Sequence, residues 1–247
     1  MITQQTLIIG ANSAIAQAIG IEHGHLNNSE IVLISRGFSE SALSTYQNLP
    51  NARRISVEDY SANSIELAIT KIQAESSLPI TNVFVCNGIL HSETIQPEKR
   101  LEDFDPESFN QVMSANALTP MLWLQKLVPV LTGKLRCNLI VFSARVGSIS
   151  ENQLGGWYSY RASKAALNMM LKTASVELAR RAKNIKVIVF HPGTTDTELS
   201  KPFQKNVPKG KLFTCEFVAQ QLLEIVTRQE LDHTASFLDW KGETINW

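Results

Sequence analysis

Short apolar runs recur along the chain and are separated by longer segments that mix polar and apolar positions. The runs are rich in β-branched residues and apolar on both alternating faces, as expected of strands covered by helices on each side. The run at 55–57 is the weakest, and the one at 237–238 is very short. Together the pattern predicts strands at 6–9, 31–34, 55–57, 83–85, 139–142, 187–190 and 237–238.

The segments between these runs carry helix signals. A helical pattern follows Ser13, and Ser61 and Thr214 each stand just before apolar residues that recur at helical spacing, where a hydroxyl can cap a helix. Pro106 is placed to begin a long helix, and Pro120 to kink or split it. Strand and helix alternate throughout, which predicts an α/β fold: a doubly wound parallel sheet with helices on both faces.

No repeat, low-complexity tract or linker interrupts the 247 residues, so we expect a single domain spanning 1–247 with loop-like insertions at 91–105 and 200–213. Hydrophobic residues make up 44% of the chain, enough for one core, and the formal net charge of zero gives no field for nucleic acid. The three cysteines are far apart and show no metal-ligand spacing. Without a signal peptide or a long apolar segment, a cytoplasmic protein with no membrane partner is expected.

The first predicted strand runs into a turn that has the position of a phosphate-binding turn. Backbone N–H groups and the positive end of the following helix can meet a dinucleotide pyrophosphate there. Ala14 and Ala16 stand where the dinucleotide fingerprint has its second and third glycines, so the motif alone is weak. The residues assigned to this cofactor contact are Gly10, Asn12, Ser13, Ala14 and Ile15.

The second predicted strand ends in Ser35-Arg36, which bears on the choice of cofactor. An acidic residue here would bind the ribose hydroxyls of NAD, whereas an arginine can pair with the 2′-phosphate of NADP. The competing interpretation is that Arg36 is only a solvated loop residue. NADP(H) is therefore expected in preference to NAD(H).

The strongest local signal is Tyr160 with Lys164, four residues apart at the start of a predicted helix and therefore on one face. A free tyrosine titrates near pH 10, and a neighbouring ammonium group with a cationic oxidised nicotinamide would favour the phenolate and lower that pKa. Tyr158 is the rival, but no lysine stands at the matching spacing from it. A surface pair at this spacing is the plain alternative.

The run Ala162-Ser163-Lys164-Ala165-Ala166-Leu167 behind Tyr160 resembles the active-site signature of the short-chain dehydrogenase/reductase family. The resemblance covers essentially the whole chain and implies a single Rossmann-type domain. Within the family, the segments 143–148, 199–204 and 240–247 look most like the C-factor and sniffer-like carbonyl reductase branch. Further positions that match family segments are Asp59 and Tyr60, Asn87 and Gly88, Asn116, and Pro192, Gly193, Thr195 and Thr197.

The resemblance implies reversible hydride transfer between NADP(H) and a carbonyl or secondary alcohol, with Tyr160 as the acid/base and Lys164 holding the nicotinamide ribose. Asn116 would anchor a water in a proton relay. The family has two serines at the end of the fifth strand, the second catalytic, but Ala144 occupies that second position here. The carbonyl-polarising role is therefore assigned to Ser143, with Ser148 as the alternative.

Two other functions remain open: a C-factor-like, cofactor-binding regulatory protein with vestigial catalysis, and a dehydratase or epimerase on the same fold. The expected partner is a small carbonyl or alcohol substrate whose identity the sequence does not give. A homodimer or homotetramer is also expected by analogy with the family. The apolar residues that suggested such an interface are Met121, Leu122, Trp123, Leu124, Met169 and Met170.

Overall fold

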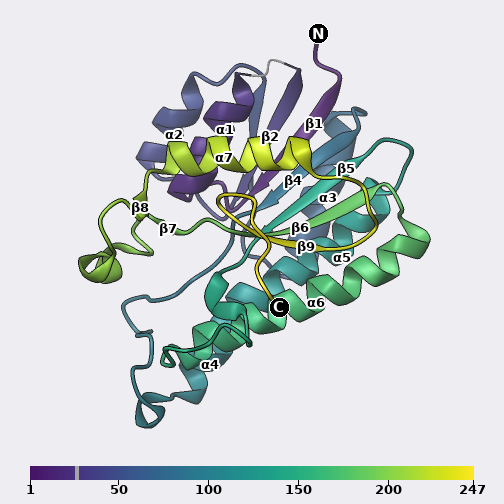
Figure 1. Cartoon of the computed structure of the whole chain (residues 1–247). Helices are drawn as coiled ribbons and strands as arrows, with labels where there is room; N and C mark the ends of the chain where they lie inside the picture. The colour runs from purple at the N-terminus through teal and green to yellow at the C-terminus, as the bar shows by residue number, and fades with distance from the viewer. Residues whose placement is uncertain (26–27) are drawn as a thin grey trace.

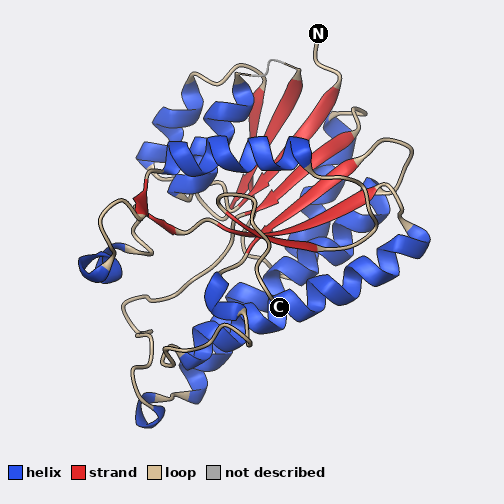
Figure 2. Cartoon of the chain, in the orientation of Figure 1, coloured by secondary structure: helices blue, strands red, loops and turns tan. Residues whose placement is uncertain are grey.

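A parallel β-sheet forms the centre of the molecule, as the computed structural model shows for residues 1–25 and 28–247 (Figure 2). In the described part of the chain the sheet has seven strands in the order β3-β2-β1-β4-β5-β6-β9, all parallel. Each strand contains one of the predicted apolar runs, or most of it. The strands are β1 Gln4–Ile9, β2 Ser29–Ser35, β3 Ala52–Ser56, β4 Ile80–Val85, β5 Cys137–Phe142, β6 Ile185–His191 and β9 Ser236–Asp239.

Helices cover both faces of this sheet, so the predicted doubly wound α/β fold is confirmed (Figure 1). One core lies between the sheet and α1, α2 and α7, and a second lies between the sheet and α3, α5 and α6. The helices are α1 Ala14–Gly24, α2 Glu40–Gln47, α3 Ala62–Glu75, α4 Pro106–Met113, α5 Thr119–Leu131, α6 Tyr158–Arg181 and α7 Cys215–Arg228.

The predicted helix starts are correct at the level of single side chains. Ser13 accepts a hydrogen bond from the backbone N–H of Ala16, and Ser61 and Thr214 make the same kind of bond to the third residue after them. Each hydroxyl satisfies one of the N–H groups that a helix leaves unpaired at its N-terminus.

The helix begun by Pro106 is split before Pro120, as predicted, but the break has a specific form. A five-residue π-helical segment, η2 Ser114–Leu118, joins α4 to α5. Proline has no N–H to donate to the preceding turn, so a wider turn ahead of Pro120 accommodates the missing bond. Asn116 lies inside this segment and is buried.

The two loop-like insertions contain short ordered elements. Residues 91–105 include the 3₁₀ turn η1 Leu101–Asp103, and residues 200–213 include the 3₁₀ helix η4 Lys201–Asn206 and the strand β8 Leu212–Phe213. β8 pairs with β7 Thr194–Thr195, which follows β6. A further 3₁₀ turn, η3 Arg145–Gly147, follows β5.

The residues that suggested an oligomer interface are only partly on the surface. Trp123 and Leu124 belong to the core of the single chain, which is the alternative open to an apolar helix of this kind. A long apolar helix buries these side chains against the sheet, which sequence alone cannot distinguish from a subunit interface. Met169, by contrast, is 67% exposed on α6.

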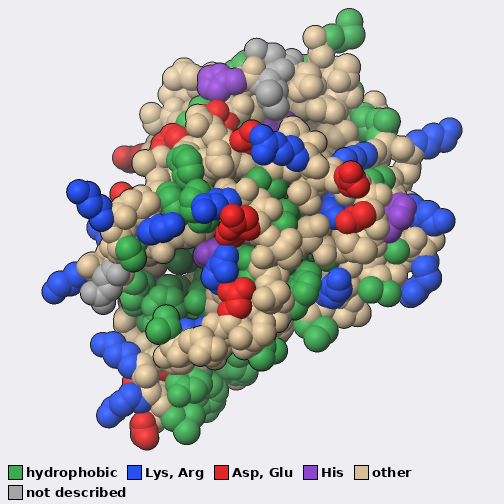
Figure 3. Space-filling model, in the orientation of Figure 1, with side chains coloured by type: hydrophobic (Ala, Val, Ile, Leu, Met, Phe, Trp, Pro, Cys, Tyr) green, Lys and Arg blue, Asp and Glu red, His purple; other side chains and the backbone are tan. Residues whose placement is uncertain are grey.

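Acidic and basic side chains are interspersed over the face of the molecule seen in Figure 3, in keeping with the formal net charge of zero. No helix in residues 1–25 and 28–247 has both the length and the apolar character needed to cross a bilayer.

The packing of α7 on the sheet gives a direct test of this core. Leu222 of α7 is fully buried, whereas Leu67 of α3 is 71% exposed. We expect Leu222→Ala to lower the free energy of unfolding by about 2–5 kcal/mol, because the lost methyl groups leave a cavity. Leu67→Ala should change it by less than about 0.5 kcal/mol. Urea unfolding of the two variants and the wild type measures both values, and equal effects would contradict the assigned core.

Candidate active site

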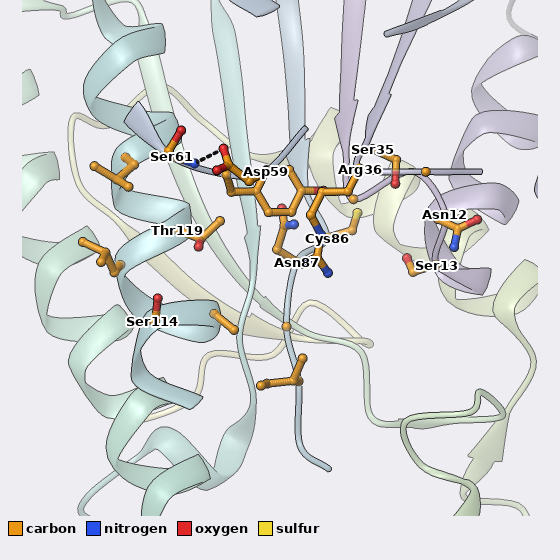
Figure 4. Close-up of a pocket in the computed structure, with 18 of the residues that line it drawn as sticks. Asn12, Ser13, Ser35, Arg36, Asp59, Ser61, Cys86, Asn87, Ser114 and Thr119 are labelled. Atoms are coloured by element: carbon orange, nitrogen blue, oxygen red, sulfur yellow. Dashed lines mark hydrogen bonds between the residues drawn. The ribbon is translucent and has the colours of Figure 1, made fainter. Parts of the chain in front are cut away.

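A cleft with a volume of about 1240 Å³ lies at the carboxyl ends of β1, β2 and β4. Figure 4 shows Asn12, Ser13 and Ser35 on one side of it and Ser114 and Thr119 on the other, with Arg36 and Asp59 between them. In a doubly wound sheet this is the edge at which ligands bind. The expected cofactor residues that line it are Gly10, Asn12, Ser13, Ser35, Arg36, Asp59, Tyr60, Asn87 and Gly88.

The turn after β1 has the conformation that a phosphate-binding turn needs. Gly10 has a φ of +77°, and a Cβ at this position would stand 3.2 Å from the backbone nitrogen of Asn87. Only glycine meets both requirements, the positive φ and the close approach to Asn87. The turn therefore needs a glycine at position 10. The turn leads directly into α1, whose N-terminus is positive and favours an anion.

Ala14 and Ile15, also assigned to the cofactor, are the first residues of α1 but are not among the residues lining the cleft. Their backbone N–H groups belong to the first turn of the helix, so their expected contact would be made by backbone rather than by side chain. The assignment stays a prediction.

Arg36 lies over the ring of Tyr60, with the guanidinium carbon 5.3 Å from the ring centroid. The Arg36 side chain is exposed, and this contact places its guanidinium beside the Tyr60 ring at the cleft wall. Asp59 lies beside it and accepts a hydrogen bond from the backbone N–H of Ser61 at 2.9 Å. Hydrogen bonds from Ser64 and Ser61 lower the pKa of Asp59 to about 2.

One part of this wall was not foreseen from the sequence. The side-chain oxygen of Asn12 accepts a hydrogen bond from the backbone N–H of Ser39 at 2.7 Å, joining the turn after β1 to the N-cap of α2. Ser39 lines the cleft next to Gly37 and Phe38. The local signal that could have located it is Ser39 itself, whose hydroxyl caps α2 by accepting from the backbone N–H of Ala42.

The cleft also fits a dinucleotide by the chemistry of its walls. The side-chain oxygen of Asn87 is buried and has no hydrogen-bond partner within the described residues. An unsatisfied buried acceptor is costly unless a ligand or water supplies a donor. The cleft thus offers separate groups for the parts of a dinucleotide. The turn at Gly10 and the N-terminus of α1 suit a pyrophosphate, Arg36 suits a ribose phosphate, and the Asn87 oxygen suits a base.

The expected catalytic residues Asn116, Tyr160 and Lys164 meet beside Gly88. Lys164 is buried and its Nζ donates to the backbone carbonyl of Phe142 at 3.0 Å, while lying 5.9 Å from the centroid of the Tyr160 ring. A Cβ at Gly88 would come within 3.5 Å of the Lys164 Nζ and 3.3 Å of the Asn116 Oδ1. Gly88 therefore marks the place where cleft and catalytic group join.

Asn116 ties three segments together. Its Oδ1 accepts from the backbone N–H of Ile89 at 2.7 Å, and its Nδ2 donates to the Ile89 carbonyl at 2.8 Å and to the Ser163 hydroxyl at 3.0 Å. Ser163 in turn donates to the carbonyl of Tyr160 at 2.8 Å. Both hydrogens of the amide are used, so a relay water would have to bind elsewhere on this residue. The relay stays a prediction.

Backbone packing holds Lys164 in place from the other side. A Cβ at Gly147, in η3, would stand 2.8 Å from both the carbonyl carbon and the Cβ of Lys164. No other residue allows η3 to lie this close to α6, because real Cβ atoms do not approach backbone to that distance.

Burial dominates the titration of the two central groups. It raises the pKa of Tyr160 to about 12 and lowers that of Lys164 to about 8. The expectation that Lys164 and an oxidised nicotinamide together lower the pKa of Tyr160 concerns the cofactor-bound protein and stays a prediction. In the protein alone, taking the phenolate charge out of water sets the direction of the shift. Among the described residues, the Tyr160 hydroxyl has no hydrogen-bond partner.

The two serines considered for carbonyl polarisation are both engaged elsewhere. The Ser143 hydroxyl donates to the side-chain oxygen of Asn168 at 2.6 Å. Ser148 is buried beside Ser150 and accepts from the backbone N–H of Glu151 at 3.3 Å. Neither hydroxyl bonds to Tyr160 in the structure, and a role for either serine stays a prediction.

The segment after β6 lies at the same edge of the sheet, but it is not part of the cleft lining. Gly193 has a φ of +73°, and a Cβ there would stand 2.7 Å from the ring of Phe213. The Thr195 hydroxyl donates to the carbonyl of Pro192 at 3.5 Å, and the Thr197 hydroxyl to that of Thr195 at 3.4 Å. Their expected contact with the nicotinamide stays a prediction.

Comparison with known proteins agrees with this architecture. The short chain dehydrogenase family matches residues 4–208 of the chain. The C-signal protein of Myxococcus xanthus is 29% identical over 148 residues, which cover 60% of this chain and 83% of that protein.

Two solved structures share the fold over their whole length. The carbonyl reductase Sniffer of D. melanogaster superposes with a TM-score of 0.83 at 18% identity, and each chain is covered to 100%. The NADPH-bound carbonyl reductase from chicken fatty liver superposes with a TM-score of 0.82 at 20% identity, again with 100% of each chain covered. At these identities the likeness shows the Rossmann-type fold.

The buried Lys164 gives a stability prediction for the protein without cofactor. Its pKa falls from 10.5 unfolded to about 8 folded, so the unfolded state binds more protons between these values and stability rises with pH. The pKa of Tyr160 rises from 10.0 to about 12, so stability falls again above pH 10. We expect the melting temperature of the wild type to rise from pH 8 to 10 relative to that of Lys164→Met.

The exposed Lys183 supplies the control. The melting temperature of Lys183→Met should follow that of the wild type across the same range. If the melting temperatures of the wild type and of Lys164→Met change in parallel from pH 7 to 10, Lys164 is not desolvated.

Proposed function

Since the chain belongs to the short-chain dehydrogenase family, we propose that it is an NADP(H)-dependent oxidoreductase that interconverts a carbonyl and a secondary alcohol. Tyr160 is the acid/base in this proposal. The observation that carries it is the meeting of Tyr160, Lys164 and Asn116 beside Gly88, at the end of a cleft shaped for a dinucleotide.

Lys164 and Tyr160 have different roles in this proposal. NADPH, when bound, supplies the hydride for the carbonyl carbon. The phenol of Tyr160, kept protonated by burial, donates its proton to the carbonyl oxygen as alkoxide develops there. Lys164 is held at its Nζ by Phe142, close to the wall at Gly88, where a ribose hydroxyl can reach it. In the oxidative direction the same phenol has to lose its proton first.

Polarisation of the carbonyl oxygen falls mainly to the Tyr160 phenol. The position that holds the catalytic serine in the family is Ala144, and the Ser143 proton is directed to Asn168. Ser143 contributes only if its hydroxyl turns from Asn168 toward the substrate, with Ser148 as the alternative. A site with a single strong hydrogen-bond donor suits a carbonyl group whose own substituents already make its carbon electrophilic.

Preference for NADP(H) rests on Arg36 and on the absence of an acidic residue after β2, where the chain reads Ser35-Arg36-Gly37. The guanidinium at the cleft wall can pair with a 2′-phosphate in a charge-assisted hydrogen bond. The related chicken carbonyl reductase was solved with NADPH bound, which is consistent with this choice.

A regulatory, cofactor-binding protein with weak catalysis is the second candidate. The observation that favours it is the missing serine: Ala144 replaces it, and neither Ser143 nor Ser148 bonds to Tyr160. Tight NADPH binding without turnover on aldehydes, ketones and diketones would support this function over the first.

The role of Tyr160 is tested by Tyr160→Phe. We expect carbonyl-dependent NADPH oxidation to fall by at least about a hundredfold, the usual contribution of a positioned acid. NADPH affinity, measured by fluorescence, should stay within about twofold because the ring remains. Tyr158→Phe, at a position 38% exposed, serves as the matched control and should keep full turnover. Unchanged turnover in Tyr160→Phe would remove Tyr160 from the mechanism.

The role of Arg36 is tested by Arg36→Gln. The loss of a charge-assisted hydrogen bond of about 1.5–3 kcal/mol should raise the Kd for NADPH by roughly ten- to a hundredfold. The Kd for NADH, which lacks the 2′-phosphate, should hardly change. Arg54→Gln, at an exposed position on β3, is the control. An equal increase in the Kd values for NADPH and NADH would show that Arg36 does not bind the 2′-phosphate.

A further inference from the structure

The helix that carries Tyr160 begins without a capping side chain of its own. Its N-cap residue is Trp157, whose indole cannot accept a hydrogen bond from the first turn. Trp157 is also left-handed, with φ +53° and ψ +44°, a rare conformation for a bulky residue. The first N–H groups of α6 therefore need an acceptor from elsewhere, because a helix start leaves them unpaired.

Glu98, from the segment between β4 and η1, supplies that acceptor. It is only 4% exposed, and its two carboxylate oxygens each lie 3.2 Å from the backbone nitrogen of Ser159. The Ser159 hydroxyl donates to the same carboxylate. Ser159 is the second residue of α6, which is where an N-cap side chain makes its bond. A carboxylate at the positive end of a helix is stabilising.

The same residue also fixes the left-handed turn before the helix. The backbone N–H of Trp157 donates to the carbonyl of Glu98 at 2.6 Å. Gly156 has a φ of +63°, and a Cβ there would stand 3.3 Å from the Glu98 carbonyl oxygen. Glycine is thus required at 156 by the close approach of the 91–105 segment as well as by the backbone angle.

Arg161 holds the other end of this turn. Its guanidinium donates to the carbonyl of Gly156 at 2.9 Å and to that of Gly155 at 3.0 Å. The turn 155–157 therefore has its last amide bonded to Glu98 and its first two carbonyls bonded to Arg161. Tyr160 lies between the two residues, Ser159 and Arg161, that receive these restraints.

The restrained turn places the Trp157 ring against Tyr160. The centroids of the two rings are 6.1 Å apart in an edge-to-face arrangement, and the Trp157 ring is 4.9 Å from that of Phe203 in η4. Backbone and ring contacts thus act together on the position of the Tyr160 phenol. A misplacement of about 1 Å at a reacting group is enough to lower turnover substantially.

We infer that Glu98 is a positioning residue for Tyr160, acting as the N-cap of the catalytic helix from a distant segment of the chain. The inference rests on the proposed function, in which Tyr160 is the acid/base. This role does not require Glu98 to touch the substrate.

Two substitutions in the full chain test this role. Glu98→Gln keeps an acceptor oxygen for Ser159, whereas Glu98→Ala removes it. Glu216→Gln is the matched control, since Glu216 is an exposed carboxylate in the first turn of another helix, α7. Turnover, its pH profile, NADPH affinity and melting temperature are measured for all three.

For Glu98→Gln we expect kcat to stay within about twofold of the wild type, because the amide oxygen still accepts from the Ser159 N–H. For Glu98→Ala we expect kcat to fall about tenfold or more, with NADPH affinity within about twofold. Glu216→Gln should match the wild type in every measurement.

A second readout does not depend on turnover. Titration of tyrosinate absorbance in the NADP⁺-loaded protein, as the difference between each background and the same background carrying Tyr160→Phe, reports the Tyr160 pKa directly. We expect it to stay at the wild-type value in Glu98→Gln and to shift in Glu98→Ala, where the phenol moves within its buried surroundings. A shifted titration without turnover on any carbonyl would reject the proposed function while supporting the positioning role.

A Glu98→Ala variant with the wild-type titration and pH profile would overturn the inference. So would a Glu98→Ala variant that loses turnover only in proportion to its folded fraction. If Glu98→Ala does not fold, Glu98→Asp decides the question: its carboxylate is one methylene group shorter and loses the bonds to Ser159, and unchanged turnover in that variant would overturn the inference.

Discussion

The parallel pairing of β1 with β4 is the constraint on which the rest of the site depends. The strand order reverses at this pair: β2 and β3 continue to one side of β1, and β5, β6 and β9 continue to the other side of β4. After β1 the chain continues on one face of the sheet, and after β4 it continues on the other face. This divergence opens a crevice between the carboxyl ends of the two strands. The backbones after β1, at Gly10, and after β4, at Asn87, consequently lie so close that a Cβ at Gly10 would stand 3.2 Å from the Asn87 nitrogen. The positions of the cleft and of the expected catalytic residues follow from this one adjacency.

Much of the fold was predictable because its signals are local. Strands buried on both faces read as continuous apolar runs, and every run, down to the two residues at 237–238, corresponds to a strand. The caps at Ser13, Ser61 and Thr214 were predictable because a hydroxyl bonds only two or three residues ahead. Of the site, the cleft lining was predicted best, since it consists of strand ends that the topology brings to one edge.

The features that escaped prediction depend on contacts between distant segments. Glu98 and Ser159 are 61 residues apart, and nothing in either local sequence indicates that one caps the helix of the other. The hydroxyl of Ser143 could have pointed to several neighbours, and only packing against Asn168 on α6 decides among them. The raised pKa of Tyr160 has the same origin, because burial is a property of the whole fold. Trp123 and Leu124 looked like interface residues until the sheet beneath them was known.

The two faces of the sheet have separate hydrophobic cores, and the cleft is built from both. Phe38 packs on the core of α1, α2 and α7, Leu122 packs on the core of α3, α5 and α6, and each contributes to the cleft wall. A ligand that spans the cleft would bind only when both layers are folded, so its binding free energy would be added to the cost of unfolding either one. Saturation with such a ligand would make the two layers unfold as a single cooperative unit, even where the sheet alone couples them weakly.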